Sequence, residues 1–129
     1  MSPIETVRMF YNALERSDAS GALSLLAERL EWTEAEGFPY YSGTWHSPQE
    51  VLTNLLARVK MDWDDFSAEA ASFVSEEDQV VAFGLYLGVH KSTKKKLAAP
   101  FAHHWRVCDG RIISFAQYTD TVLVRQAMR

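Results

Sequence analysis

Residues 101–120 read FAHHWRVCDGRIISFAQYTD, and this stretch decides the fold. Apolar and polar residues alternate on both sides of Asp109-Gly110, a dipeptide favoured in two-residue hairpin turns. The stretch therefore predicts two antiparallel strands, at Leu97–Cys108 and Arg111–Tyr118. Its histidines, glutamine and aspartate stand among large apolar residues, and polar groups in such places need buried partners or a ligand. We interpret the hairpin as one wall of a pocket.

Alternation with a period of two continues upstream of this hairpin. It predicts strands near Phe66–Ser75 and Gln79–His90, which complete a four-stranded antiparallel meander. Both faces of Gln79–His90 are apolar, and a sheet of this kind is usually covered on both faces. Helices are expected on one face only, so we predict a homodimer through the other face.

Helical signals dominate the first half of the chain. Ser2-Pro3-Ile4-Glu5 is a capping box with proline at the first helical position, and it predicts a helix from residue 3. Asp18 is expected to cap a second helix that runs through Leu30. The alternation of Leu30–Glu34 then predicts a short strand.

Three further segments complete the expected organisation. Residues 37–46 are rich in aromatic and turn-forming residues, which favours a loop. Ser47-Pro48-Gln49-Glu50 repeats the capping box and opens a third helix through Val59. Thr121–Met128 fits either a terminal helical turn or an extension of the last strand. Helices followed by a meander indicate an α+β fold.

The composition limits the class of protein. The 129 residues are 47% hydrophobic, which suits one filled domain spanning residues 1–129. A formal net charge of -4 argues against nucleic acid as a partner, and no apolar run is long enough to span a membrane. The single Cys108 requires no oxidising compartment, so we expect a cytoplasmic protein. We expect neither a metal nor a cofactor, because no metal-ligand spacing and no phosphate-binding loop is present.

The order of the predicted elements resembles the nuclear transport factor 2-like superfamily, and within it the SnoaL-like polyketide cyclases and ketosteroid isomerases. Two segments carry the resemblance: Tyr41–Thr44 running into Ser47–Val51, and Trp105–Ile113 followed by Gln117–Asp120. The resemblance implies a cone-shaped, curved mixed or antiparallel sheet with the N-terminal helices on its concave face, the cystatin-like α+β barrel. It also implies an apolar cavity open at one end. It implies no single reaction, because the superfamily includes many enzymes and proteins without catalysis.

Three residues are catalytic candidates by this resemblance. Glu34 matches the region of the isomerases' general-base aspartate, although a glutamate near a strand end is also commonly solvated. His103 or His104 matches an acidic hydrogen-bond donor, and alternation places His103 with Trp105 on the cavity face. A histidine satisfied by a neighbouring backbone group is the alternative. Asp120 matches an acid and base of the cyclases, or caps a terminal helix.

Other residues are candidates for contacts with a ligand. Tyr11 loosely matches the oxyanion tyrosine of the isomerases, although it also fits a core position. Parity places Gln117 on one face together with Phe115. Aromatic side chains that would line or cover the cavity, or simply fill a core, are Trp32, Phe38, Tyr41, Trp45, Phe83 and Trp105.

These observations predict a small-molecule-binding SnoaL-like protein whose cavity takes a small apolar ligand. Its resemblance implies cofactor-independent acid/base catalysis of the isomerase, cyclase or hydrolase type on a small apolar carbonyl or epoxide compound. A non-catalytic module for ligand binding or dimerisation is the alternative, so whether the protein is an enzyme stays open. Convergence of Glu34, His103 and either Asp120 or Gln117 on one cavity would favour the enzyme.

Overall fold

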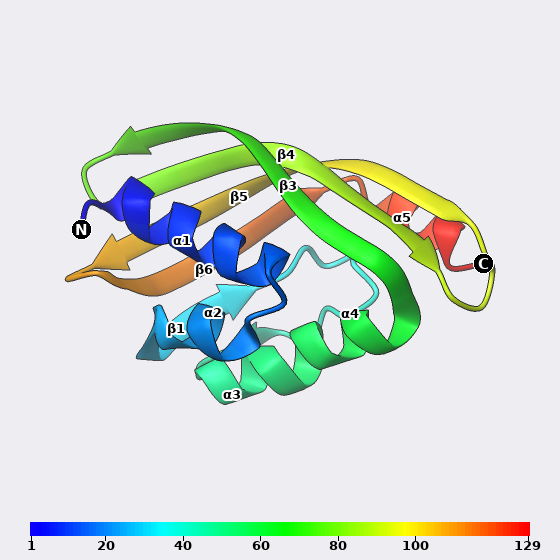
Figure 1. Cartoon of the computed structure of the whole chain (residues 1–129), viewed down its shortest axis with the longest axis horizontal. Helices are drawn as coiled ribbons and strands as arrows, with labels where there is room; N and C mark the ends of the chain where they lie inside the picture. The colour runs from blue at the N-terminus through cyan, green and yellow to red at the C-terminus, as the bar shows by residue number, and fades with distance from the viewer.

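The computed structural model describes residues 1–129, and it contains one curved, open, six-stranded sheet in the order β2-β1-β6-β5-β4-β3 (Figure 1). Helices α1 to α4 lie together on one side of this sheet. The strands are β1 (Leu26–Thr33), β2 (Thr44–Trp45), β3 (Trp63–Glu76), β4 (Gln79–His90), β5 (Lys96–Cys108) and β6 (Arg111–Thr119). The helical segments are α1 (Pro3–Glu15), α2 (Ala19–Ser24), α3 (Pro48–Val51), the π-helical turn η1 (Leu52–Leu56), α4 (Ala57–Asp62) and α5 (Thr121–Ala127).

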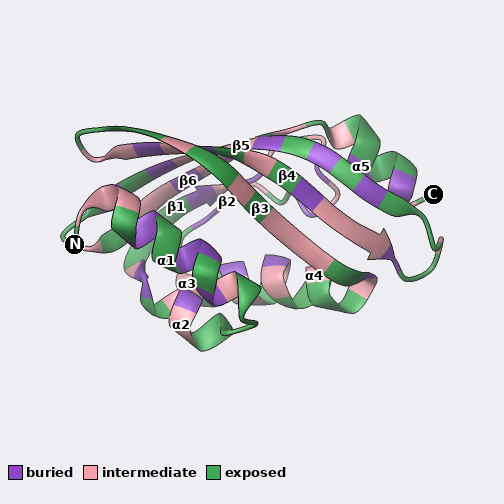
Figure 2. Ribbon diagram, turned by 45° about the horizontal axis from the view of Figure 1, so that its top comes forward, coloured by how far each residue is buried: buried purple, intermediate pink, exposed green.

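Helix α1 begins at the predicted capping box. The Glu5 backbone N–H donates to the Ser2 hydroxyl at 3.2 Å, and the Ser2 backbone N–H donates to the Glu5 carboxylate at 3.1 Å. These two bonds satisfy donors that a helix start leaves free. The buried side of α1 carries Val7, Phe10 and Tyr11 against the sheet (Figure 2). The capping box thus fixes where Tyr11 enters the interior.

The second helix is shorter than predicted. Asp18 caps it as expected, because its side chain accepts from the Gly21 N–H, but α2 ends at Ser24. Leu26 and Leu30 belong to β1 instead. A spacing of four residues puts side chains on one face of a helix and also on one face of a strand, so these leucines fit both patterns. Parallel pairing of β1 with β6 decides for the strand.

The aromatic loop and the third helix also differ from the prediction in detail. Thr44–Trp45 forms the short edge strand β2 within the expected loop. The helix that follows is continuous from Pro48 to Asp62, but a π-helical turn interrupts it at Leu52–Leu56. Ser47 accepts from the Glu50 N–H as predicted, whereas the Glu50 carboxylate accepts from the His46 N–H and from the Ser47 hydroxyl, and not from the Ser47 backbone N–H. The second capping box is therefore only half formed.

The predicted antiparallel meander is confirmed in strands β3 to β6. Asp109 and Gly110 have φ values of 50° and 74°, the positive values that a primed hairpin turn requires. Gly84 in β4 permits a close approach of β3, because a Cβ built there would lie 2.1 Å from the Glu69 carbonyl oxygen. A register shift between Ala70 and Ser72 accompanies this approach. The C-terminal segment, which fitted either a helical turn or an extension of the last strand, forms helix α5.

The two faces of the sheet differ as alternation predicts. On β5, the buried residues include Phe101, His103, Trp105 and Val107, which confirms the predicted inner set. On β6, Gln117 shares the inner face with Phe115. The convex face keeps exposed apolar side chains, namely Val74, Phe83, Leu85 and Tyr118. No helix in this chain has the length and apolar character needed to cross a membrane.

Candidate functional site

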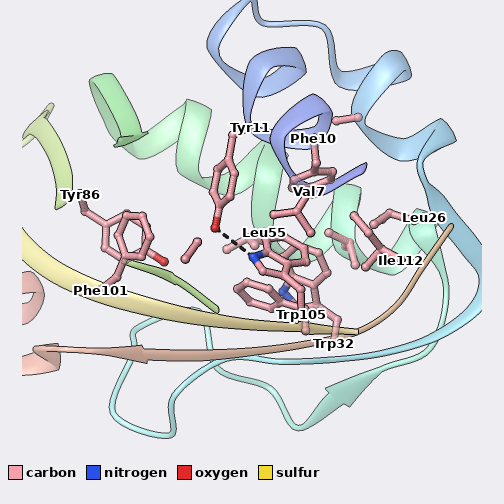
Figure 3. Packing of buried hydrophobic residues seen from close by; sticks show 14 of the residues in the cluster. Val7, Phe10, Tyr11, Leu26, Trp32, Leu55, Tyr86, Phe101, Trp105 and Ile112 are labelled. Carbon is pink, nitrogen blue, oxygen red and sulfur yellow. Dashed lines mark hydrogen bonds between the residues drawn. The ribbon is translucent and has the colours of Figure 1, made fainter. Parts of the chain in front are cut away.

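A chain of buried hydrogen bonds crosses the interior between α1 and the sheet. His103 on β5 stands at its centre: its Nδ1 lies 2.6 Å from the Tyr11 hydroxyl, and its Nε2 lies 2.5 Å from the Tyr86 hydroxyl. The Trp105 indole N–H donates to the Tyr11 oxygen at 3.0 Å (Figure 3). The Gln117 amide N–H donates to the Tyr86 oxygen at 2.8 Å. We call these five residues the polar cluster.

Glu34 lies beside the polar cluster, directly after β1. Strand β1 runs parallel to β6 and Thr33 pairs with Ala116, so Glu34 and Gln117, the next residue in each segment, lie close together. The Ala35 N–H donates to the Gln117 side-chain oxygen at 3.0 Å, which joins the two strand ends. The Glu34 Oε1 accepts from the Trp32 indole at 3.3 Å, whereas its Oε2 is buried without any partner. A buried carboxylate oxygen without a partner is costly to the fold and favours a functional role.

Burial sets the ionisation of these groups. Glu34 is 3% exposed, and desolvation raises its pKa from 4.5 to about 8, against a smaller lowering by the Trp32 hydrogen bond. Desolvation also lowers the pKa of His103 to about 3, which keeps its imidazole neutral. Burial and then the charge of Glu34 raise the pKa of Tyr86. A carboxyl group that titrates near neutral pH can act as either acid or base.

The segment after Glu34 covers this end of the interior. Phe38 packs on the Tyr86 ring, with 6.3 Å between ring centroids. The Tyr40 hydroxyl donates to Asp62 at 2.7 Å and accepts from the Trp63 indole at 3.1 Å. These contacts hold the segment against α4 and the start of β3. We call residues 35–43 the covering loop.

Aromatic side chains fill the space that the resemblance assigned to a cavity. The Trp32 and Phe115 rings stack with centroids 4.0 Å apart, and Trp32 also meets Trp105 edge to face. The rings of Phe101 and His103 stack at 3.9 Å. Two surface grooves lie elsewhere: one of about 580 Å³ beside α5 and one of about 280 Å³ beside β1. Neither groove is lined by a residue of the polar cluster.

The structure brings some of the candidate residues together and separates others. Glu34, His103, Gln117 and Tyr11 converge in the interior, but neither groove opens onto them, so the predicted convergence on a cavity is not shown. Asp120 is exposed, and its carboxylate accepts from the Leu123 N–H as the N-cap of α5.

Three aromatic candidates lie away from the polar cluster. Phe83 points to the convex face of the sheet, because successive side chains of a strand point to opposite faces and the neighbouring Ala82 is buried on the inner face. Tyr41 is partly exposed on the covering loop, and Trp45 is buried on the edge strand β2. The ligand-contact candidates near the polar cluster are therefore those carried by α1, β1, β5, β6 and the inner part of the covering loop.

Sequence analysis missed Tyr86, although it lies at the centre of the cluster. The register pairs Ala82 of β4 with His103 of β5, and Tyr86 follows Ala82 by four residues on the same face. This register, combined with parity along β4, places the Tyr86 hydroxyl among buried apolar neighbours, where it needs a partner. The close-up shows Tyr11 and Tyr86 directing their hydroxyl groups toward the same region from opposite sides (Figure 3). No set of three His, Cys, Asp or Glu side chains is placed to hold a metal ion.

A sequence model of the SnoaL-like domain matches residues 7–115. The chain belongs to the SnoaL-like family. Its fold agrees with the resemblance to the nuclear transport factor 2-like superfamily. An NTF2-like protein from Burkholderia thailandensis E264 superposes with a TM-score of 0.95 at 36% identity, over 100% of this chain and 98% of that one. An NTF2-like protein of unknown function from Burkholderia pseudomallei K96243 gives 0.88 at 26% identity, over 98% of each chain.

More distant structures share the fold of this SnoaL-like chain. TerC, co-crystallised with polyporic acid, has a TM-score of 0.86 at 23% identity and covers 98% of this chain and 97% of its own. IdmH from Streptomyces antibioticus, a proposed polyketide cyclase, has 0.83 at 18% identity, over 99% of each chain. At these identities the likeness establishes the fold alone. No functionally curated protein matches the sequence.

Proposed function

We propose that the protein binds a small uncharged carbonyl compound next to Glu34 and catalyses proton transfer on it without a cofactor. The observation that carries the proposal is the buried Oε2 of Glu34, which lacks a partner beside a hydrogen-bonded phenol and imidazole cluster. A proton acceptor beside hydrogen-bonding neighbours that stabilise an oxygen is the arrangement that such proton transfer needs, and this supports the proposal.

The reaction supported by this geometry is proton transfer at a carbon adjacent to a carbonyl. The ionised Oε2 of Glu34 takes a proton from that carbon, and the electrons of the C–H bond move toward the carbonyl oxygen. A phenol of the polar cluster donates a hydrogen bond to this oxygen while negative charge develops on it. The protonated carboxyl group then returns the proton to the same carbon or to another one. Because the pKa of Glu34 is about 8, both of its forms are populated near neutral pH.

Known structures of the same fold support a small organic molecule as the ligand. TerC was crystallised with polyporic acid, and IdmH is a proposed polyketide cyclase. Apolar rings around Glu34 and His103 suit a ligand with a hydrophobic body. The covering loop must move to admit such a ligand, since the polar cluster is buried.

Hydrogen–deuterium exchange tests this function directly. In D₂O, the wild-type protein should accelerate exchange of the acidic hydrogens of 2-tetralone, a ketone with an aromatic body, as followed by proton NMR. Glu34→Gln should reduce the enzymatic rate by about 100-fold or more, the usual minimum for losing a general base. Glu31→Gln is the matched control, because Glu31 lies exposed on β1, the strand that Glu34 directly follows. Equal rates for the wild type and the Glu34 variant would refute the catalytic role.

A non-catalytic binding module is the second candidate. The hydrogen bonds within the protein favour a binding module, because the polar atoms of Tyr11, His103 and Gln117 already have protein partners. Binding of 2-tetralone without any acceleration of exchange would select this alternative. The same experiment therefore separates the two candidates.

We also propose that two copies pair through the convex face of the sheet. Phe83 and Leu85 are 44% and 45% exposed on β4, and no helix of the chain covers them. Apolar groups gathered on one sheet face favour burial against a second copy. Phe83→Glu should convert the protein to a monomer in analytical ultracentrifugation. Met61→Glu is the control, because Met61 is also exposed but lies on α4. A monomeric wild type would contradict the pairing.

A further inference from the structure

We propose that Tyr86, and not Tyr11, donates the hydrogen bond to the oxygen of a bound ligand, opposite the free Oε2 of Glu34. This inference rests on the proposed function, because it assigns the donor within the same site. It follows from where the hydrogen atoms of the polar cluster must lie.

Two donors with a known direction fix the ends of the chain of hydrogen bonds. The Ala35 N–H donates to the Gln117 side-chain oxygen, so the amide nitrogen of Gln117 faces Tyr86 and donates to its hydroxyl oxygen. At the other end, the Trp105 indole N–H can only donate, and it donates to the Tyr11 oxygen. Each phenol oxygen therefore already accepts one hydrogen bond.

The neutral His103 carries one N–H between these two phenols, which leaves two arrangements. If Nδ1 carries the hydrogen, His103 donates to Tyr11 and accepts from Tyr86, and the hydroxyl hydrogen of Tyr11 has no acceptor. If Nε2 carries it, His103 donates to Tyr86 and accepts from Tyr11, and the hydroxyl hydrogen of Tyr86 is free. One phenol in the cluster thus always has a spare donor.

The surroundings of the two phenols decide between the arrangements. Rings of Phe10, Phe73 and Trp105 surround Tyr11, and its hydroxyl has no hydrogen-bond partner other than His103 and Trp105. A buried donor without an acceptor destabilises the fold, because its lost hydrogen bond to water is not replaced. Tyr86 is instead linked through Gln117 to Ala35, the residue directly after Glu34, and the Oε2 of Glu34 is the buried acceptor that lacks a partner. With Glu34 ionised, the hydrogen on Nε2 is favoured and Tyr86 holds the spare donor.

This arrangement defines the chemistry of the ligand. The site offers one O–H donor from Tyr86 and one carboxylate acceptor from Glu34, and no lysine or arginine hydrogen-bonds to the cluster. An anionic ligand would meet the carboxylate without a counter-charge, which is unfavourable in a buried site. The pair fits an uncharged ketone whose carbonyl oxygen faces Tyr86 and whose acidic hydrogen faces Glu34.

The position of the hydrogen on His103 can be measured without any ligand. Nitrogen-15 NMR of the assigned His103 ring distinguishes a protonated ring nitrogen from an unprotonated one. At about pH 9.5, where Glu34 is ionised, we expect the hydrogen on Nε2 and an unprotonated Nδ1. A hydrogen on Nδ1 at this pH would overturn the assignment of the donor to Tyr86.

A ligand measurement tests the donor itself. The carbonyl stretching band of bound 2-tetralone should move to lower frequency in the wild type and in Tyr11→Phe, and should lose this shift in Tyr86→Phe. If the frequency shift of the carbonyl band is lost in Tyr11→Phe and retained in Tyr86→Phe, the proposal is overturned. We expect the carboxylate 2-naphthoate to bind at least about tenfold more weakly than 2-tetralone, a difference of about 1.4 kcal/mol. Binding of 2-naphthoate as tight as that of 2-tetralone would refute the ligand class.

The proposed function and this inference fail separately. If Glu34→Gln leaves deuterium exchange unchanged, the catalytic role of Glu34 is refuted, while the NMR result on His103 still decides which phenol has the spare hydrogen. If exchange depends on Glu34 but the His103 hydrogen lies on Nδ1, the function stands and Tyr86 is not the donor.

Discussion

Replacing Glu34 with glutamine should stabilise the protein by an amount that grows with pH. Burial raises the pKa of Glu34 from 4.5 to about 8 in the folded chain. Between these two values the folded state keeps a proton that the unfolded state has released, so the free energy of unfolding falls as the pH rises. Glutamine has nearly the same shape and does not titrate. The free energy of unfolding of the variant therefore does not fall with pH for this reason.

The size of the effect follows from the two pKa values. A pKa of 4.5 in the unfolded chain and about 8 in the folded chain corresponds to roughly 5 kcal/mol once the pH exceeds both. At pH 7 the loss is already roughly 3 kcal/mol. Glu34 is only 3% exposed, so solvent screening reduces these values little. An altered hydrogen bond to Trp32 would shift the variant by a similar amount at every pH, so the change with pH is the diagnostic quantity.

Urea unfolding at about pH 4, 7 and 9 measures this change. The stability difference between Glu34→Gln and the wild type should increase by roughly 5 kcal/mol between the lowest and highest pH. Other titrating groups contribute equally to both proteins and cancel in the difference. The exposed Glu31→Gln should show no such trend. A difference for Glu34 that stays constant over this range would refute the argument that its carboxyl group is buried with a raised pKa.

Three further predictions concern other parts of the chain. Burial lowers the pKa of His103 from 6.5 to about 3, so NMR should find its imidazole neutral down to about pH 5. The contribution of His103 to the free energy of unfolding is present above pH 6.5 and is lost as the pH falls toward 3, which is opposite in direction to the effect of Glu34. Asp120→Ala should cost about 1 kcal/mol in urea unfolding through loss of the α5 cap, and an effect on 2-tetralone exchange would contradict its place outside the site. Gly84→Ala should cost about 1–3 kcal/mol, more than Gly88→Ala, because its new Cβ would lie 2.1 Å from the Glu69 carbonyl oxygen, whereas a Cβ at Gly88 would lie 3.3 Å from the Phe66 Cα. Equal thermal stability of the two variants would contradict this reasoning.

The sequence predicted the fold where a local pattern has one structural solution. Alternation along β5 separated His103 from His104 correctly, and Asp109-Gly110 formed the expected turn. The pattern failed where two solutions share a spacing, as for Leu26 and Leu30, which suit both a helix and a strand. Pairing with β6, a contact far along the chain, decided that case. Such contacts are not visible in a local pattern.

The candidate site was predictable in part for the same reason. Glu34, His103 and Gln117 followed from the family resemblance and from parity. Tyr86 required the register between β4 and β5, which depends on the assembled sheet. Asp120 matched a family position, but its carboxylate caps a helix because α5 begins immediately after it. A residue type at a matching position does not determine the direction of its side chain.

The covering loop has a consequence for the speed of binding. Phe38 lies against Tyr86, and the Tyr40 hydroxyl is hydrogen-bonded to Asp62 and Trp63, so Glu34 is closed off from solvent. A ligand cannot reach this carboxylate by collision alone and has to wait until a covering element opens. The observed association rate should then level off at high ligand concentration, at a value equal to the frequency of opening. The hydrogen bonds of Tyr40 would in that case regulate a rate, although they lie outside the chemistry of the site.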